Sequence, residues 1–293
     1  GCKNSRALIY RESGKTEEAK KIYEELVVIR KNQNKEDKLS SVYGNLASVY
    51  LVEQNYPMSI RYNEMALKIA EKYKQEGTAL YLYGNIALGY QWMGDMDKSA
   101  DYIKKAIDLN RRLKNKQQEG VMLNNLGVIY QKQNFYDSAE KYYLMAHNIN
   151  KQDFIPRKNL GDLFFFKGYD ENKKGNIDQS LTYYKISAGY NENNPILLNN
   201  MAFIYSYKKQ YDSALICLNK AISYDPNSLV SFENLSSINL EIKEYNKAVE
   251  FANKALNLDK NSRKALSVLI GANSALGNNS EVQKYQQLLN QIN

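Results

Sequence analysis

The chain has 293 residues, of which 43% are hydrophobic and 25% charged, and its net charge is +8 with charges of both signs mixed along its length. It contains only 4 Pro and 15 Gly, which favours long, uninterrupted helices because these residues usually end them. No apolar run approaches the roughly 18 residues typical of a membrane span, and two cysteines, Cys2 and Cys217, exclude a disulfide framework.

The first residues, Gly1-Cys2-Lys3-Asn4, resemble the cleavage point of a bacterial lipoprotein, where a small residue precedes the cysteine that is acylated. Cys2 is therefore a candidate for lipidation, although an ordinary cysteine fits the same residues equally well. Acylation would anchor the protein to a membrane of the bacterial cell envelope. Without it, a cytoplasmic location is expected.

A tyrosine followed nine positions later by a small residue recurs along the chain. The pairs are Tyr10/Ala19, Tyr50/Ser59, Tyr90/Ser99, Tyr130/Ala139 and Tyr205/Ala214. Continued to the C-terminus, this frame predicts eight repeats: the first five, in 1–194, are spaced by about 40 residues, and the last three, in 195–293, by 34. No residues remain for a second domain, so 1–293 is predicted to be one solenoid.

Each repeat is predicted to hold two helices. In the second repeat Tyr43, Leu46, Ala47 and Tyr50 fall at i, i+3, i+4 and i+7, which is one stripe of an α-helix. A turn follows, marked in four repeats by Gly14, Gly94, Gly175 and Gly277, and the second helix then opens with Asp97, Asp137, Asp178, Asp212 or Pro57. The extra residues of the early repeats are expected to lengthen both helices by about one turn.

This pattern of an apolar residue, a small residue and a tyrosine, a glycine turn, and Ala-x-x-x-aromatic-x-x-Ala resembles the tetratricopeptide repeat family over essentially the whole chain. The resemblance implies an all-α, right-handed superhelical solenoid of antiparallel helix pairs, with the first helices lining the concave face. The fifth repeat departs from the pattern, because Lys167 and Glu171 fall where apolar residues are expected. Either that helix is rotated or the solenoid bends there.

An asparagine recurs on a flank of the first helices that lies about 100° from the buried stripe. Five of the eight repeats carry it, as Asn45, Asn85, Asn125, Asn200 and Asn234. A carboxamide offers donors and an acceptor that match those of a peptide group, so a row of them can hold an extended chain by its backbone. In some tetratricopeptide repeat proteins a similar asparagine ladder does this. The alternative is that these asparagines cap helices or bridge neighbouring repeats.

The same flank is otherwise rich in aromatic residues and has few charges. Its members include Tyr81, Trp92, Phe166, Tyr169, Phe203 and Tyr207, together with the basic Lys132. Exposed aromatic residues commonly anchor a protein partner, although packing between adjacent repeats is the alternative for each of them. With the asparagines, these residues predict a concave groove for an extended or helical peptide with apolar side chains.

Three other classes of function compete with this one. The single histidine, His147, has no partner that suggests a triad, and no phosphate loop or metal motif is present, so we expect no catalysis, cofactor or metal. A helical-repeat RNA binder is disfavoured by the few basic residues on the flank and by the change of period. A sensory or regulatory module of a larger signalling system remains an alternative. The sequence thus predicts a non-catalytic scaffold that binds a protein or peptide.

Overall fold

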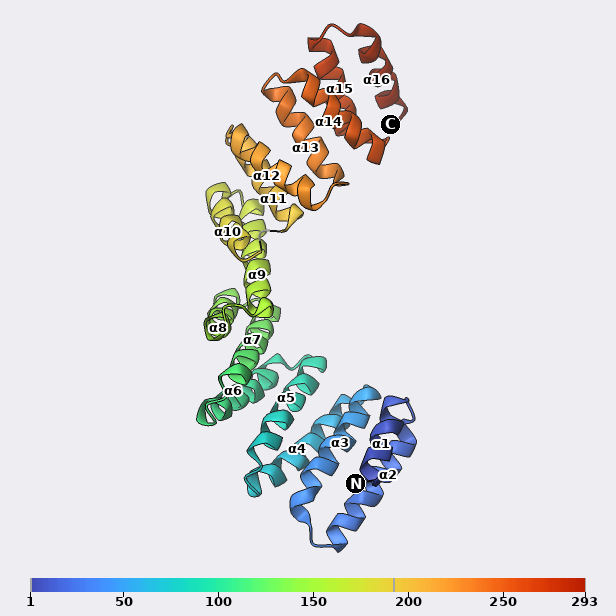
Figure 1. Ribbon diagram of the computed structural model, residues 1–293, viewed down its shortest axis with the longest axis vertical. Coiled ribbons are helices and arrows are strands. Elements are labelled where there is room, and N and C mark those ends of the chain that lie inside the picture. The colour runs from blue at the N-terminus through green and yellow to red at the C-terminus, as the bar shows by residue number, and fades with distance from the viewer. Residues whose placement is uncertain (1, 192, 293) are drawn as a thin grey trace. The chain divides into compact units, whose positions relative to one another are not determined.

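The computed structural model describes residues 2–191 and 193–292, apart from the side chain of Cys2, and the lipidation prediction for Cys2 therefore lies outside the described residues. Within this part of the chain, sixteen α-helices and one 3-10 helix (η1, Glu36–Lys38) occur and no strand (Figure 1). The predicted all-α fold of helix pairs is confirmed. None of the described helices combines the length and the apolar character that crossing a membrane requires.

The helices alternate between the first and the second helix of each repeat. The first helices are α1 (Cys2–Glu12), α3 (Leu39–Val52), α5 (Glu76–Trp92), α7 (Lys116–Lys132), α9 (Phe154–Lys173), α11 (Pro195–Tyr207), α13 (Leu229–Glu241) and α15 (Arg263–Ala275). The second helices are α2 (Thr16–Asn32), α4 (Tyr56–Lys72), α6 (Met96–Arg112), α8 (Tyr136–Ile149), α10 (Ile177–Tyr190), α12 (Tyr211–Tyr224), α14 (Tyr245–Leu258) and α16 (Asn279–Gln291).

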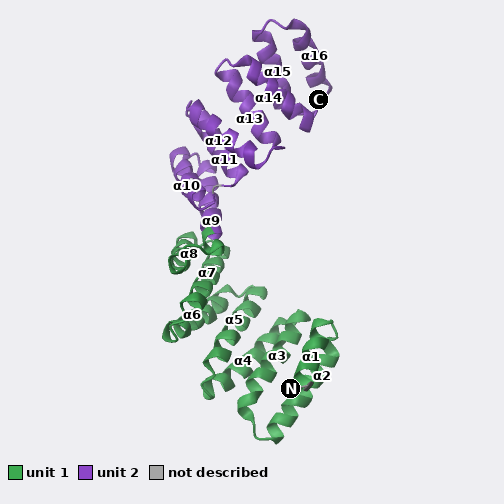
Figure 2. Ribbon diagram, in the orientation of Figure 1, with its two compact units in different colours: residues 1–157 green, residues 158–293 purple. Residues whose placement is uncertain are grey.

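The chain divides into two compact units, residues 1–157 (unit 1) and residues 158–293 (unit 2), shown in separate colours in Figure 2. Within each unit helices pack on the next one in sequence, as α3 does on α4 and α13 on α14. Successive first helices also contact one another, α3 with α5 in unit 1 and α11 with α13 in unit 2. A single solenoid over 1–293 stays a prediction.

The turn after each first helix has the same conformation in all eight repeats. One residue in it has a positive φ: Gly14, Gln54, Gly94, Asn134, Gly175, Lys209, Lys243 and Gly277. The N–H of the following residue then reaches back to a carbonyl of the first helix, as Asp95 does to Tyr90 at 2.9 Å. This is the bonding of a Schellman motif, which satisfies a carbonyl that the helix end leaves open. The predicted glycine turns are confirmed, and four further repeats make the same turn without glycine.

The long repeats owe their length mainly to longer helices. The four helices from α4 to α7 each have 17 residues, whereas α11 to α14 have 13 or 14. The expectation that both helices are longer by about one turn in every early repeat is wrong for α3, α8 and α10, which have 14 residues each. In the fifth repeat the extra length lies in α9, with 20 residues.

Tyrosines and small residues together fill the space between helices. The tyrosine that closes a first helix stacks on a tyrosine of the second helix: Tyr50 on Tyr62 at 5.3 Å, Tyr90 on Tyr102 at 5.8 Å and Tyr130 on Tyr142 at 5.4 Å between ring centroids. Offset stacking of this kind adds to the free energy of area burial.

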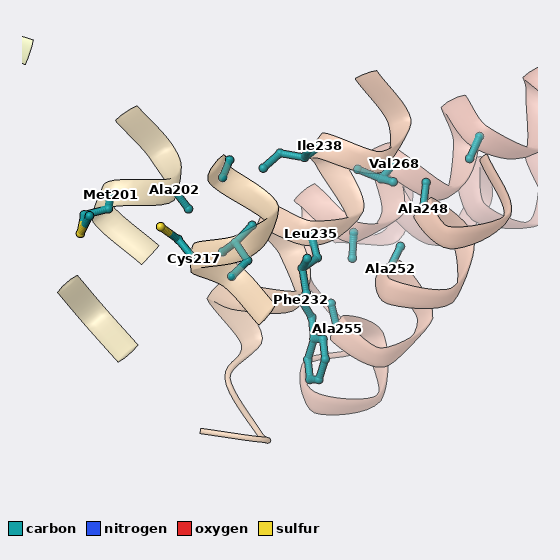
Figure 3. Close-up of a cluster of buried hydrophobic side chains, with 14 of the residues drawn as sticks. Met201, Ala202, Cys217, Phe232, Leu235, Ile238, Ala248, Ala252, Ala255 and Val268 are labelled. Carbon is teal, nitrogen blue, oxygen red and sulfur yellow. The ribbon is translucent and has the colours of Figure 1, made fainter. Parts of the chain in front are cut away.

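Small residues let the helices approach closely. In unit 2, Ala248, Ala252 and Ala255 of α14 belong to one buried cluster with Phe232 and Leu235 of α13 (Figure 3). Cys217, in the same cluster, is a core residue as its apolar surroundings in the sequence suggest, and burial raises the pKa of its thiol.

Candidate functional site

The flank that carries the five asparagines, here called the asparagine flank, lies at the surface of the first helices. The aromatic residues predicted for the site have exposed fractions between 44% and 71%: Tyr81, Trp92, Phe166, Tyr169, Phe203 and Tyr207. Asn125 and Lys132 are also exposed, and the other four asparagines are half-buried. The flanks of α1, α3 and α5 adjoin in unit 1, and those of α11, α13 and α15 in unit 2, because these successive first helices touch.

Unit 1 has three neighbouring cavities along this flank, each beside one of its asparagines. The first, of about 310 Å³, lies between α3 and α5 and is lined by Ser40, Ser41, Gly44, Asn45, Gly77, Thr78, Tyr81 and Leu82. The second, of about 380 Å³, lies between α5 and α7 over α6 and is lined by Gly77, Leu80, Tyr81, Gly84, Asn85, Asn110, Gln118 and Met122. The third, of about 200 Å³, is lined by Gly84, Ala87, Leu88, Gln91, Ser99, Ile103, Asn125, Val128 and Ile129.

The three cavities adjoin one another, because neighbouring ones share lining residues. Gly77 and Tyr81 belong to both the first and the second cavity, and Gly84 belongs to both the second and the third. We call this row of adjoining cavities the α5 groove. The row begins between α3 and α5 and continues between α5 and α7, so equivalent asparagines of three consecutive repeats border it.

The asparagines differ in whether their carboxamides are engaged. Asn45 donates to Asn4 Oδ1 at 3.0 Å, and Asn200 donates to the Tyr184 hydroxyl at 3.4 Å. Among the described residues, the side chains of Asn85 and Asn125 have no hydrogen-bond partner. The two amides of the α5–α7 crevice are thus open to a ligand.

Asn234, in unit 2, is held from two sides. Its Nδ2 donates to Asn199 Oδ1 at 3.4 Å, and its Oδ1 accepts from Lys264 Nζ at 2.6 Å. The side chain links its own helix α13 to α11 and α15. The alternative of bridging neighbouring repeats therefore describes Asn234, whereas the open arrangement describes Asn85 and Asn125.

The α5 groove is polar at its base but carries no charge. Asn110 and Ser99, both on α6, are 2% and 1% exposed. Asn110 Nδ2 donates to the Ala106 carbonyl at 2.9 Å, while Asn110 Oδ1 and the Ser99 hydroxyl have no partner within the described part of the chain. Among the described residues that line the three cavities, none is Asp, Glu, Lys or Arg.

Several predicted residues lie outside the α5 groove. Trp92 stacks on Tyr56 of α4 with 6.0 Å between ring centroids, so one of its faces packs within the protein although 61% of the residue is exposed. Lys132 ends α7 and lines none of the three cavities. Gly77 and Gly84 line the cavities but could not be predicted from the sequence, because a glycine within a helix does not indicate what lies opposite it.

The remaining predicted residues belong to unit 2. Phe166 makes an edge contact with Phe165, and Lys173 Nζ lies 4.7 Å from the centroid of the Tyr169 ring. Phe203 and Tyr207 project from α11 as exposed side chains. In the described part of the chain, no group of three or more His, Cys, Asp or Glu side chains is arranged to hold a metal ion.

Solved structures with the same general arrangement are only distantly similar. BtubC from P. vanneervenii is 17% identical with a TM-score of 0.45, over 69% of this chain and 86% of that one. The TPR2AB domain of yeast Sti1, in its pHSP90 complex, is 15% identical with a TM-score of 0.39, over 99% and 96%. The first TPR of Spaghetti (RPAP3), bound to an HSP90 peptide, is 20% identical with a TM-score of 0.40, over 41% and 95%.

A search of curated proteins gave no match to the sequence. Family models described as tetratricopeptide repeat match residues 2–33, 77–152, 195–228 and 231–262, which together make up more than half of the chain. The matches fall in both compact units and agree with the helix pairs described above. The chain belongs to the tetratricopeptide repeat family of protein-interaction scaffolds.

Proposed function

We propose that this protein is a non-catalytic scaffold that binds a partner protein by a peptide segment held in the α5 groove of unit 1. The observation that carries the proposal is the pair of unengaged carboxamides, Asn85 and Asn125, which border adjoining cavities on consecutive first helices. A carboxamide can both donate to a peptide carbonyl and accept from a peptide N–H, so it binds a backbone whatever its side chains.

Apolar contacts supply the rest of the interaction. Tyr81 is shared by two cavities, and Leu88 and Met122 line the crevice between α5 and α7. Tyr81 and Leu88 are exposed at present, so covering them removes apolar surface from water, which favours binding. Large side chains at the centre of an interface commonly contribute most of its free energy.

The test uses peptides selected on the wild-type protein from a random library displayed on phage. The double variant Asn85→Ala/Asn125→Ala should bind the selected peptides about tenfold more weakly or worse, because each lost hydrogen bond contributes about 0.5–1.5 kcal/mol. Affinity is measured by fluorescence anisotropy, and circular dichroism checks that helicity is unchanged.

Asn234→Ala is the matched control, since it removes the same group from a side chain that is already held by Asn199 and Lys264. It should leave peptide affinity within about twofold of the wild type. Equal affinity of the wild type and the double variant would contradict the proposal.

The uncharged lining of the groove favours a peptide over RNA. Nucleic acid is held largely by Lys and Arg at its phosphates, and its affinity then falls steeply as salt is raised. Peptide affinity should change by less than about threefold between about 50 and 200 mM salt, and a steep loss would indicate RNA instead. A sensory or regulatory role would use the same binding event and differ only in what that event controls.

A further inference from the structure

Two glycines of α5, Gly77 and Gly84, are not explained by the packing of the protein. A Cβ built on either would meet no atom within 4 Å, and neither has a positive φ. Most other glycines inside helices behave differently: a Cβ on Gly89 would lie 2.6 Å from Ile60, and one on Gly127 2.6 Å from Tyr143. Glycine is less stable than alanine inside a helix, so stability disfavours glycine at positions 77 and 84.

Both of these glycines lie at junctions of the α5 groove. Gly77 stands between the first and second cavities, and Gly84 between the second and third. A methyl group at either place would project into the passage without touching the protein itself. Glycine in such a position allows another backbone to approach closely.

The distance between the two glycines suits a short extended segment. Seven residues of α-helix rise by about 10.5 Å, and an extended chain advances about 3.3 Å per residue. About three residues of an extended peptide would therefore span from Gly77 to Gly84. A helical segment with its side chains is about 10–12 Å wide, so an extended segment fits cavities of about 200–380 Å³ better.

The charge of the lining restricts the side chains of that segment. The described lining residues carry no charge, and Tyr81, Leu80, Leu88 and Met122 supply apolar walls. A charged side chain placed there would lose its hydration without gaining a partner, which is costly. Neutral side chains lose little, and those with amide or hydroxyl groups can pair with the polar base.

From these features we infer that the occupant of the α5 groove is an extended, uncharged segment of a partner protein, whose backbone passes over Gly77 and Gly84 and whose side chains enter the adjoining cavities. This inference rests on the proposed function and adds the path and chemical class of the ligand. Asn85 and Asn125 border this path and bind the peptide groups of the segment.

The experiment narrows the passage by one methyl group at a time. Gly77→Ala and Gly84→Ala are compared with Gly189→Ala in α10, where a Cβ also meets nothing within 4 Å but no cavity of the α5 groove is involved. All three variants should keep or raise the melting temperature. Only the first two should bind the phage-selected peptides about tenfold more weakly or worse.

A second arm scans the selected peptides. Replacing each of the central residues by Asp or by Lys should weaken binding about tenfold or more, whereas replacement by Gln should be tolerated. Tolerance of Asp or Lys at every position would overturn the assignment of an uncharged ligand.

The outcomes separate this inference from the proposal beneath it. If Gly77→Ala and Gly84→Ala bind like the wild type while Asn85→Ala/Asn125→Ala binds weakly, the path is wrong and the scaffold function stands. If none of these variants weakens binding, both fail. A dimer in sedimentation that Gly84→Ala abolishes would assign the groove to a second copy of this chain and overturn the inference.

Discussion

Asparagines at equivalent positions of the first helices have different partners in different repeats. Asn45 is bonded to Asn4 of the preceding repeat, and Asn234 accepts from Lys264 of the following one. Asn85 has a crevice beside it instead. The helical frame sets the position of each side chain, while the residue opposite, which belongs to another repeat, sets its partner.

A buried carboxylate illustrates how one residue links two helices. Glu119, in the first turn of α7, is 4% exposed and accepts from Lys116 Nζ and from Arg111 Nε of α6, each at 2.8 Å. Burial pushes the pKa of this carboxyl up, but the bonds from Lys116 and Arg111 outweigh it and hold the pKa below 4.5. The ionised form is therefore favoured by folding.

We predict that Glu119→Gln lowers the free energy of unfolding by about 1 kcal/mol at neutral pH. Because the folded pKa is lowered, this stabilisation is present above about pH 4.5 and is lost as the pH falls through the folded pKa. Urea unfolding at about pH 7 and about pH 3 measures it. A difference between wild type and variant that is the same at both pH values would show that the charge contributes nothing.

At the scale of the element, the turn between paired helices is the most regular feature of the chain. It needs one residue in the left-handed region, and Gly94 supplies it with φ of 81°. Gln54 and Lys243 make the same turn with φ of 58° and 65°. A residue with a Cβ is strained in this region, by about 1–2 kcal/mol, whereas glycine is not.

We predict that Gln54→Gly and Lys243→Gly each stabilise the protein by up to about 1 kcal/mol, since the relief of strain exceeds the added entropy of the unfolded chain. Gly94→Ala should destabilise the protein by about 1–2 kcal/mol. No atom lies within 4 Å of the new Cβ, so this cost comes entirely from the backbone conformation. Thermal unfolding checks both directions. Destabilisation by Gln54→Gly and Lys243→Gly would show that strain is absent from these turns.

On the scale of the whole molecule, the division into two compact units has an energetic consequence. In a repeat protein each helix pair is stabilised mainly by its neighbours, so a local loss of stability spreads only over nearby repeats. Leu266, fully buried on α15, belongs to the core cluster of unit 2. Leu46, on α3, belongs to a separate cluster within unit 1.

We predict that Leu266→Ala, which removes about 2–5 kcal/mol of local stability, raises amide hydrogen exchange in α13 to α16 and leaves α3 to α6 unchanged. Leu46→Ala is the reciprocal variant and should affect unit 1 alone. Mass spectrometry of exchanged peptides gives the readout. A uniform increase over both units would mean that the chain unfolds as one cooperative body.

The sequence by itself determined the helix pairs, the positions of the turns and the side of the first helices on which the asparagines lie. These follow from periodicity within about 20 residues, which decides which stripe of a helix is apolar. The left-handed conformation of Gln54 and Lys243 could not be predicted, because a polar residue at a helix end is compatible with several conformations. The shorter second helices α8 and α10 were missed for a related reason, since residues between two helices can be added to either.

Only the tertiary structure decided which asparagines are open and where the chain leaves a groove. Asn85 and Asn234 stand at equivalent points of similar helices, yet one borders a cavity and the other is held by Lys264. The difference depends on side chains about 30 residues away in sequence, brought near by the stacking of repeats. Local periodicity selects the face that is buried, but long-range packing selects what each exposed side chain meets.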